Sequence, residues 1–263
     1  MNGEIIPIGP EHEDFLRDES RQIGTAEAIV FPRTEADVIA ALQNAIGNIT
    51  IQGALTGIAA SAVPSGGTIL NLSRMNRIGE IRGQAVTVEP GALLSDICAA
   101  ADQQDLFFPP DPTETSASIG GMAACNASGA QSFFYGSTRN WISALRVVLV
   151  DGSVLSLRRG EQKAVGRRFS LTTDSGRTIE GPLLSYRMPD VKSAAGYFVR
   201  DDMDLIDLFI GAEGTLGVIT ELELKLLEKP GARIGLTAFL PTDAAALKFV
   251  RTVRESEPMP VAI

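Results

Sequence analysis

The sequence predicts a fold that mixes helices and strands, in which a parallel unit comes first and an antiparallel hairpin follows. The parallel unit is indicated by an apolar strand over residues 27–31, a helix that starts at Thr34, and a second strand over residues 49–52. The hairpin is indicated by apolar residues over 142–157, interrupted by an Asp-Gly turn at 151–152. Between these two parts lie long tracts of small residues that cannot fill a hydrophobic core.

The helix after Thr34 is supported by its first turn and by its apolar spacing. Thr34 and Asp37 have the spacing of a capping box, and apolar residues recur at helical intervals as far as Ile46. The other elements expected in the first half are strands over residues 68–72 and 85–89 and a helix over residues 93–104.

The second half is expected to contain an exposed excursion, a glycine turn and a final amphipathic helix. These elements span residues 158–181, 205–227 and 232–255, the last segment beginning with a strand before its helix. Residues 258–263 resemble a strand that has just begun, so we expect the sequence to end inside a further domain.

Composition excludes several classes of function. The chain has 263 residues and a net charge of −9, which argues against nucleic acid or an anionic membrane surface as a partner. His12 is the only histidine and the first lysine is Lys163, so histidine-dependent catalysis, multi-histidine metal sites and a P-loop lysine in the glycine-rich half are all disfavoured. An acidic N-terminus without an apolar core, two cysteines and no apolar run of membrane-spanning length predict a cytoplasmic protein without a membrane span.

The first tract of small residues, 52–67, follows a strand and reads QGALTGIAASAVPSGG. Unhindered backbone N–H groups after a strand can form an anion site without a basic side chain, and a diphosphate is the natural occupant. Thr56 can add a hydroxyl donor. The alternative for this loop taken alone is a plain surface connection, although sixteen residues is long for one.

The second tract, 107–136, reads FFPPDPTETSASIGGMAACNASGAQSFFYG. Small residues and glycines let the backbone approach a large, flat, polar ligand closely. A loop with two short helical turns is the favoured alternative for this tract taken alone. A diphosphate on the first tract and a planar ring along the second would describe one extended ligand, and FAD fits that description.

Five motifs, in order, resemble the FAD-binding domain of the vanillyl-alcohol-oxidase / p-cresol-methylhydroxylase type, within it the group of glycolate oxidase subunits and D-lactate dehydrogenases. They are QGALTGIAASAVPSGGTILNLSRMNRI (52–78), VTVEPGALLSDI (86–97), FFPPDPTETSASIGGMAACNASGAQSFFYGSTRNWI (107–142), AAGY (194–197) and LFIGAEGTLGVIT (208–220).

The resemblance implies an α+β fold of two lobes that hold FAD, a small parallel α/β lobe and a lobe with an antiparallel sheet and helices. The implied divisions are an N-terminal extension over 1–26, a first lobe over 27–90, a second lobe over 91–229, and the start of a truncated C-terminal cap domain over 230–263.

The same resemblance implies which residues hold the cofactor. The diphosphate would lie on the first loop, at Gly53, Ala54, Leu55, Thr56 and Gly57. The second tract would follow the diphosphate, the ribityl chain and the ring; it begins at Pro110 and Asp111 and continues with Ser118, Gly120, Gly121, Asn126, Ser128, Gly129 and Tyr135. The adenosine end would lie by Glu213, Gly214, Gly217, Val218 and Ile219. Many relatives have Arg-Gly-Gly-Gly-Thr where this chain has Gln52-Gly53-Ala54-Leu55-Thr56, so a possible anion contact is lost and Leu55 narrows the loop.

Covalent members of the family often use a histidine in this region, and this chain has none there. We therefore expect non-covalent FAD. From the composition we expect no metal, and at Cys125 we expect a small buried side chain.

The resemblance implies an FAD-dependent dehydrogenase or oxidase that takes a hydride from a 2-hydroxy acid such as glycolate or D-lactate and passes electrons to an unknown acceptor. No catalytic base is assigned, because in the relatives it comes mainly from the cap domain, and this chain is expected to turn over substrate poorly alone. Two alternatives stay open: a flavin-binding or electron-transfer subunit completed by a partner chain, and a domain that no longer binds flavin. A homo-oligomer is also possible.

Overall fold

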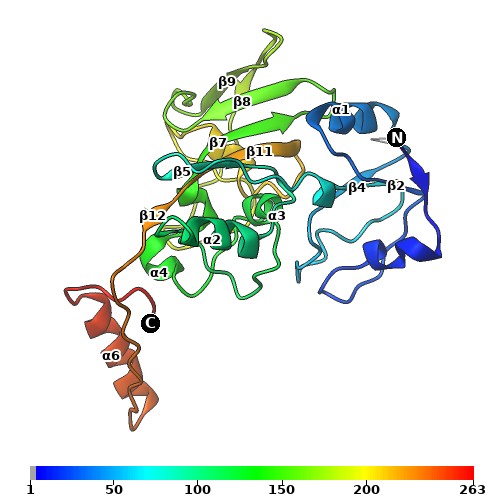
Figure 1. Ribbon diagram of the computed structural model, residues 1–263. Coiled ribbons are helices and arrows are strands. Elements are labelled where there is room, and N and C mark those ends of the chain that lie inside the picture. Colours follow the sequence, from blue (N-terminus) through cyan, green and yellow to red (C-terminus); the bar gives the residue numbers. More distant parts are fainter. Residues whose placement is uncertain (1–3) are drawn as a thin grey trace.

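Two four-stranded sheets form the two lobes of the protein in the computed structural model, which describes residues 4–263 (Figure 1). The first sheet has the order β1-β2-β4-β3, with β2, β4 and β3 parallel and β1 antiparallel at the edge. Its strands are β1 (Ile6–Pro7), β2 (Ala28–Val30), β3 (Ile49–Gln52) and β4 (Thr68–Asn71). The predicted parallel unit is thereby confirmed.

Helix α1 (Glu35–Asn44) crosses between β2 and β3 and begins at the predicted capping box. The Asp37 N–H donates to the Thr34 hydroxyl at 3.1 Å, and the Asp37 carboxylate accepts from the Thr34 N–H at 3.0 Å. Val38 and Ala41 are the buried residues of this helix. The predicted C-terminal end at Ile46 is two residues too long, because Ala45 already has an extended backbone.

The second sheet is antiparallel throughout and has the order β5-β11-β7-β8. Its strands are β5 (Ala85–Val88), β7 (Ile142–Val148), β8 (Val154–Arg158) and β11 (Val218–Lys225). Strands β7 and β8 form the predicted hairpin. The predicted lobe boundary at residue 90 assigns β5 to the first lobe, but β5 pairs with β11, so we propose a boundary ahead of β5.

Short helices lie against one side of this second sheet, as Figure 1 shows for α2 and α3. The helices of this lobe are α2 (Leu94–Asp102), α3 (Ile119–Ala124), α4 (Ser132–Tyr135) and α5 (Ile206–Phe209). One continuous core cluster joins them to the sheet, and its fully buried side chains include Ile97, Ile119, Leu145 and Leu222. The α+β class and the two-lobed arrangement expected from the sequence are confirmed.

Peripheral elements complete the described chain. They are the pair β6 (Leu106–Phe107) and β12 (Leu227–Glu228), the hairpin β9 (Arg168–Thr172) and β10 (Thr178–Pro182), helix α6 (Asp243–Arg254), and 3-10 turns at Pro10–Leu16, Leu72–Arg74 and Thr138–Trp141. The exposed excursion predicted over residues 158–181 is the β9–β10 hairpin. Of the N-terminal extension predicted over 1–26, residues 1–3 lie outside the described residues.

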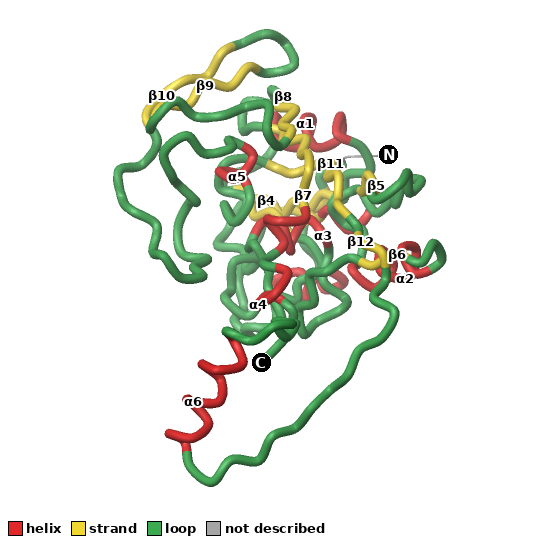
Figure 2. The backbone as a smooth tube through the Cα atoms, turned by 90° about the vertical axis from the view of Figure 1, so that its left-hand side faces the viewer, coloured by secondary structure: helices red, strands yellow, loops and turns green. Residues whose placement is uncertain are grey.

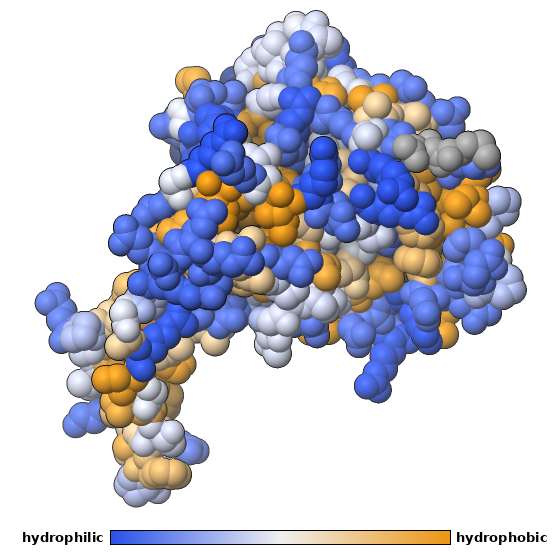
Figure 3. Space-filling model, in the orientation of Figure 1, coloured by the Kyte–Doolittle hydropathy of each residue, from blue (hydrophilic) through white to orange (hydrophobic). Residues whose placement is uncertain are grey.

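The strand expected at the start of segment 232–255 does not form, although α6 does. Residues 232–240 follow an extended path away from both sheets (Figure 2), with Leu236 and Phe239 each 92% exposed. A strand needs a neighbour for its backbone hydrogen bonds, and no described strand lies beside this segment. Apolar side chains therefore gather on the protruding C-terminal segment (Figure 3). Residues 258–263 form no strand either. Among the described residues, no helix combines the length and apolar character needed to cross a bilayer.

A partly buried ion pair joins the two lobes. The Arg146 guanidinium of β7 donates to both Glu35 oxygens of α1, at 2.8 and 3.0 Å, and the Thr220 hydroxyl of β11 donates to the same carboxylate at 2.7 Å. The hydrogen bonds from Arg146 lower the pKa of Glu35 below its ordinary value of 4.5, although burial acts in the opposite direction. The lowered pKa means that ionised Glu35 stabilises the folded state.

We expect Glu35→Gln to lower the free energy of unfolding by about 1–2 kcal/mol at pH 7, because Arg146 loses one of its two charged partners and keeps only Asp174, at 3.1 Å. The Glu35 contribution is complete above its unfolded pKa near 4.5 and is lost as pH falls through the lower folded pKa. Urea unfolding at pH 7 and pH 3 measures this, and the difference from the wild type should shrink at pH 3. Glu80→Gln, in an exposed pair with Arg82, is the control and should change little. A constant difference at both pH values would contradict the assignment.

Candidate cofactor-binding site

A cavity of about 480 Å³ lies where the two lobes meet, and three segments of the chain form its walls. The first wall is the loop that leaves β3, the second is the tract around α3, and the third is the segment between α5 and β11. The segments are residues 51–62, 112–128 and 209–219, together with Leu72 and Pro90. The structure therefore brings both predicted small-residue tracts to one cavity.

The first wall presents backbone N–H groups without protein partners. Within residues 4–263, the N–H groups of Leu55, Thr56 and Gly57 donate to no protein acceptor, whereas the Ala54 N–H donates to the Ser118 hydroxyl at 3.3 Å. Leu55 has a left-handed backbone with φ of 62°, a conformation found in the concave anion sites that successive N–H groups form. A run of such N–H groups is a site for an anion.

Glycines in this region are required by close backbone approach. A Cβ atom on Gly53 would collide with the Ser118 hydroxyl, and one on Gly120 would lie 2.6 Å from the Pro90 Cβ atom. A Cβ atom on Gly129 would collide with the Asp111 carbonyl. The small residues therefore bring the first loop against the start of α3 and fold the second tract upon itself.

Hydrogen bonds connect the third wall to the other two. The N–H groups of Gly211 and Glu213 donate to the carbonyls of Ala123 and Ala124 at 2.9 Å each, so this wall is attached to the end of α3. On the cavity side, the Ser61 hydroxyl of the first wall donates to the Glu213 carboxylate at 2.6 Å. Glu213 has a left-handed backbone with φ of 50°, which turns the chain toward the cavity.

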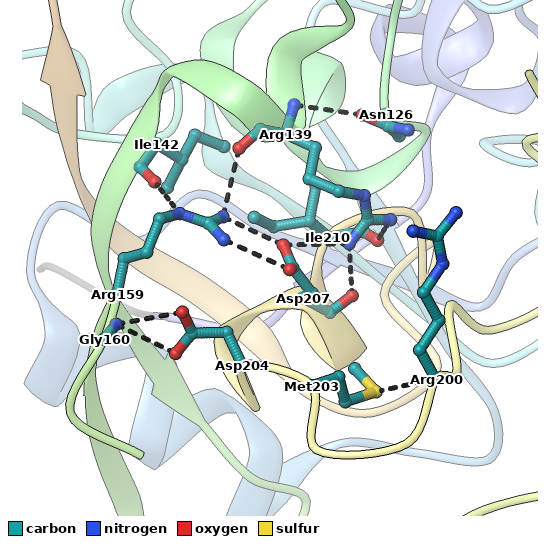
Figure 4. A network of polar contacts seen from close by, with 10 residues as sticks. All are labelled: Asn126, Arg139, Ile142, Arg159, Gly160, Arg200, Met203, Asp204, Asp207 and Ile210. Atoms are coloured by element: carbon teal, nitrogen blue, oxygen red, sulfur yellow. Dashed lines mark hydrogen bonds and ion pairs between the residues drawn. The ribbon is translucent and has the colours of Figure 1, made fainter. Parts of the chain in front are cut away.

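Behind the third wall, two arginines share one buried carboxylate (Figure 4). Asp207 of α5 accepts from Arg159 at 2.8 and 3.1 Å and pairs with Arg139 at 3.2 Å. The Arg139 guanidinium also donates to the backbone carbonyls of Asp207 and Ile210. The backbone N–H of Arg139 donates to the side-chain oxygen of Asn126 at 3.0 Å. Burial lowers the pKa of Arg139, while Asp207 acts in the opposite direction. The network thus links the second tract to the third wall.

Charged side chains that reach the cavity are acidic. Among the described lining residues there is no Lys, Arg or His, and the carboxylates are those of Glu114 and Glu213. Cys125 lines the cavity and is exposed, so the expectation of a buried residue there was wrong; it sits at the end of α3, where the chain turns into the cavity wall. Desolvation by its neighbours, together with the Glu213 charge, raises the pKa of the Cys125 thiol. Residues 4–263 contain no group of three or more potential metal ligands.

Most of the residues expected to hold the cofactor line the cavity. They are Gly53, Ala54, Leu55, Thr56, Gly57, Ser118, Gly120, Gly121, Ser128, Glu213, Gly214, Gly217 and Ile219. Those that do not line it are Pro110, Asp111, Asn126, Gly129, Tyr135 and Val218.

Several residues in this second group support the walls instead. Asp111 accepts from the Gln131 amide at 2.9 Å, Asn126 binds Arg139, and Tyr135 packs edge-on against Phe107 and Trp141. Val218 is 1% exposed, because its side chain belongs to the core under β11.

Sequence reasoning missed other lining residues. Phe209 and Leu216 give the third wall its apolar surface, and Pro112, Thr113 and Glu114 close one side of the second tract. The apolar pattern of 205–227 indicated core residues and gave no sign that Phe209 also faces a cavity.

Comparison with known proteins agrees with the geometry. The family model described as "FAD binding domain" matches residues 26–158. The chain is 34% identical to a D-lactate dehydrogenase of Anaerostipes hadrus over 246 residues, covering 89% of this chain and 44% of that protein. It is 31% identical to the glycolate oxidase subunit GlcD of Bacillus subtilis, covering 82% of this chain and 39% of that protein. The chain thus spans less than half the length of these curated relatives.

Solved structures share the fold at lower sequence identity. Alkyldihydroxyacetonephosphate synthase superposes with a TM-score of 0.64 at 21% identity, covering 91% of this chain and 39% of that one. The 6-hydroxy-D-nicotine oxidase of Arthrobacter nicotinovorans superposes with a TM-score of 0.63 at 18% identity, covering 87% and 43%. At these identities the likeness concerns the fold.

We expect Arg139→Met to lower the free energy of unfolding by about 3 kcal/mol, because two carbonyls and part of Asp207 lose a buried donor. Urea unfolding measures this. Arg200→Met is the matched control. Arg200 stacks on the Phe198 ring at 5.1 Å from its centre, and Arg139 stacks on the same ring at 4.3 Å. Because Arg200 is exposed, its loss should lower the free energy of unfolding by about 1 kcal/mol or less. Equal losses in the two variants would mean that the network does not hold the wall.

Proposed function

The chain belongs to the FAD binding domain family, and from that premise we propose that its cavity holds FAD with the diphosphate against residues 55–57. The observation that carries the proposal is the run of backbone N–H groups without protein partners on a wall that has no basic side chain. FAD is the cofactor of the family. The fit is supported by the glycines at positions 53 and 120, whose missing Cβ atoms let the backbone walls come close.

The remaining parts of FAD follow from this position. We propose that the chain between diphosphate and ring runs along Ser118, Gly121 and Ser128, and that the adenosine end lies by the third wall. There Glu213 offers carboxylate oxygens as acceptors, while Ile219 and Leu216 offer apolar surface. Of the predicted residues outside the cavity lining, Asp111, Asn126, Gly129 and Tyr135 then act by holding the walls.

We further propose that the whole protein is a flavin-dependent oxidoreductase acting on a 2-hydroxy acid such as glycolate or D-lactate. Bound FAD supplies the acceptor for a hydride from the substrate carbon. The residues of this chain bind and orient the cofactor, and we assign no catalytic base among them. Support comes from the relatives named as D-lactate dehydrogenase and glycolate oxidase subunit.

A second candidate is a flavin-binding subunit completed by a partner chain, which the word "subunit" in the name of the Bacillus relative favours. Steady-state assays with D-lactate and glycolate and an artificial electron acceptor distinguish the two. Turnover by the whole protein without another chain supports the enzyme, and flavin binding without turnover until a partner is added supports the subunit. A homo-oligomer and a cytoplasmic location stay predictions.

We expect Gly53→Ala to weaken FAD binding about tenfold or more, because the added Cβ atom displaces the Ser118 hydroxyl and shifts the loop. Titration of apo-protein with FAD, followed by flavin fluorescence, measures the affinity. Gly231→Ala is the control, since nothing lies within 4 Å of its added Cβ atom. An unchanged affinity in Gly53→Ala, or a wild-type protein that binds no FAD, would refute the proposed cofactor site.

The absence of a histidine from the second tract and the first loop leads us to propose non-covalent FAD. Acid or heat denaturation should release all flavin into the supernatant after precipitation, with none left on the polypeptide. Flavin absorbance in the washed precipitate would overturn this expectation.

A further inference from the structure

Gln52, the last residue of β3, is a buried hydrogen-bonding centre at the start of the first wall. Its side chain is 1% exposed, and its amide nitrogen donates to the carbonyls of Phe15 and Ala62 at 2.8 Å each. Its amide oxygen accepts from the Asn71 side chain at 3.4 Å, and Asn71 also reaches the Gly53 carbonyl at 3.4 Å. Gln52 therefore joins both ends of the cavity loop to β4 and to the N-terminal segment.

The N-terminal segment, residues 15–25, forms the outer side of that loop. The Glu19 N–H donates to the Leu55 carbonyl at 3.2 Å, and the Thr25 N–H donates to the Pro64 carbonyl at 3.0 Å. Phe15 packs edge-on against Phe31 with ring centres 5.2 Å apart, which attaches the segment to the first lobe. All of this segment precedes residue 26, where the family match begins.

Asp18 fixes the side of the loop on which an anion can lie. The residue is 7% exposed, one carboxylate oxygen accepts from the Ser20 N–H at 2.9 Å, and the other oxygen has no hydrogen-bond partner among residues 4–263. That free oxygen faces Gly57, since a Cβ atom built there would lie 3.7 Å from it. Repulsion between like charges at short range favours the opposite, cavity side of the loop for a diphosphate.

We propose that Gln52 is a positioning residue for the diphosphate loop, and that residues 15–19 belong to the FAD site as its outer support. The inference rests on the proposed function. Unpaired N–H groups bind an anion well only when they are already ordered, because ordering a loop on binding reduces affinity. Gln52 orders the loop because its amide nitrogen donates to two carbonyls, those of Phe15 and Ala62. Where many relatives have an arginine, this chain has the neutral Gln52. Its amide group holds the loop in place and does not take over the anion contact of that arginine.

We test this with Gln52→Met, which keeps the side-chain length and removes both donated hydrogen bonds. FAD affinity should fall about tenfold, and amide hydrogen exchange in peptides covering residues 53–62 should accelerate in the apo-protein. Exchange in β7 and β11 should stay as in the wild type, whereas a general loss of stability would change those strands too. Gln104→Met, which changes an exposed glutamine beyond the end of α2, is the matched control and should alter neither measurement.

Gln52→Asn provides a second, milder variant if the first fails to fold. Its amide donor is kept but lies one methylene group further from both carbonyls, so its FAD affinity and loop exchange should lie between those of wild type and Gln52→Met. An affinity within threefold of wild type in the folded variants, or exchange that rises equally in β7 and β11, overturns the inference. A wild-type protein that binds no FAD refutes the proposed function instead. The exchange measurement is made without FAD and still tests whether Gln52 orders the loop.

Discussion

An anion site built from backbone N–H groups depends on a backbone that is held from outside, and this constraint organises the cavity. A lysine or arginine side chain adapts to a phosphate after binding, but a peptide N–H points only where the chain directs it. Buried polar groups supply this direction at two of the walls. Gln52 fixes the ends of the first loop, and the cluster of Arg139, Asp207 and Arg159 fixes the third wall. Ser118 connects the first loop to the second tract through its hydroxyl group.

The elements that the sequence predicted well are those defined by local chemistry. The capping box at Thr34, the Asp-Gly turn and the alternation along β11 each depend on residues within a few positions of one another. The strand expected after residue 232 failed for a different reason: its apolar and β-branched residues indicate a strand, but strand formation depends on a pairing partner that the local sequence does not contain. The same limit explains β5, whose pattern marks a strand but not the sheet to which it belongs.

The same distinction between local patterns and distant partners applies to the candidate site. Glycines and small residues in two tracts predicted close approach of the backbone, and the residues that line the cavity come largely from those tracts. The sequence did not reveal that Asn126 and Asp111 lie outside the cavity lining, because the placement of a side chain in an irregular segment depends on distant partners such as Arg139 and Gln131. It also gave no sign that Gln52 contacts Phe15, thirty-seven positions earlier.

The charges on and behind the cavity wall also affect what the cavity can hold. The charged side chains among the described lining residues are all acidic, and by themselves they would oppose an anion. Behind the third wall, however, two guanidinium groups share one carboxylate, so the cluster carries a net charge of +1, and it is largely buried. Arg139 lies directly behind Gly211, with its terminal nitrogen 3.3 Å from where a Cβ atom would be. A charge in such surroundings is poorly screened and acts over a longer range than a solvated one. The cluster therefore offsets part of the acidic potential of the lining, and the backbone N–H groups then decide where a bound diphosphate lies.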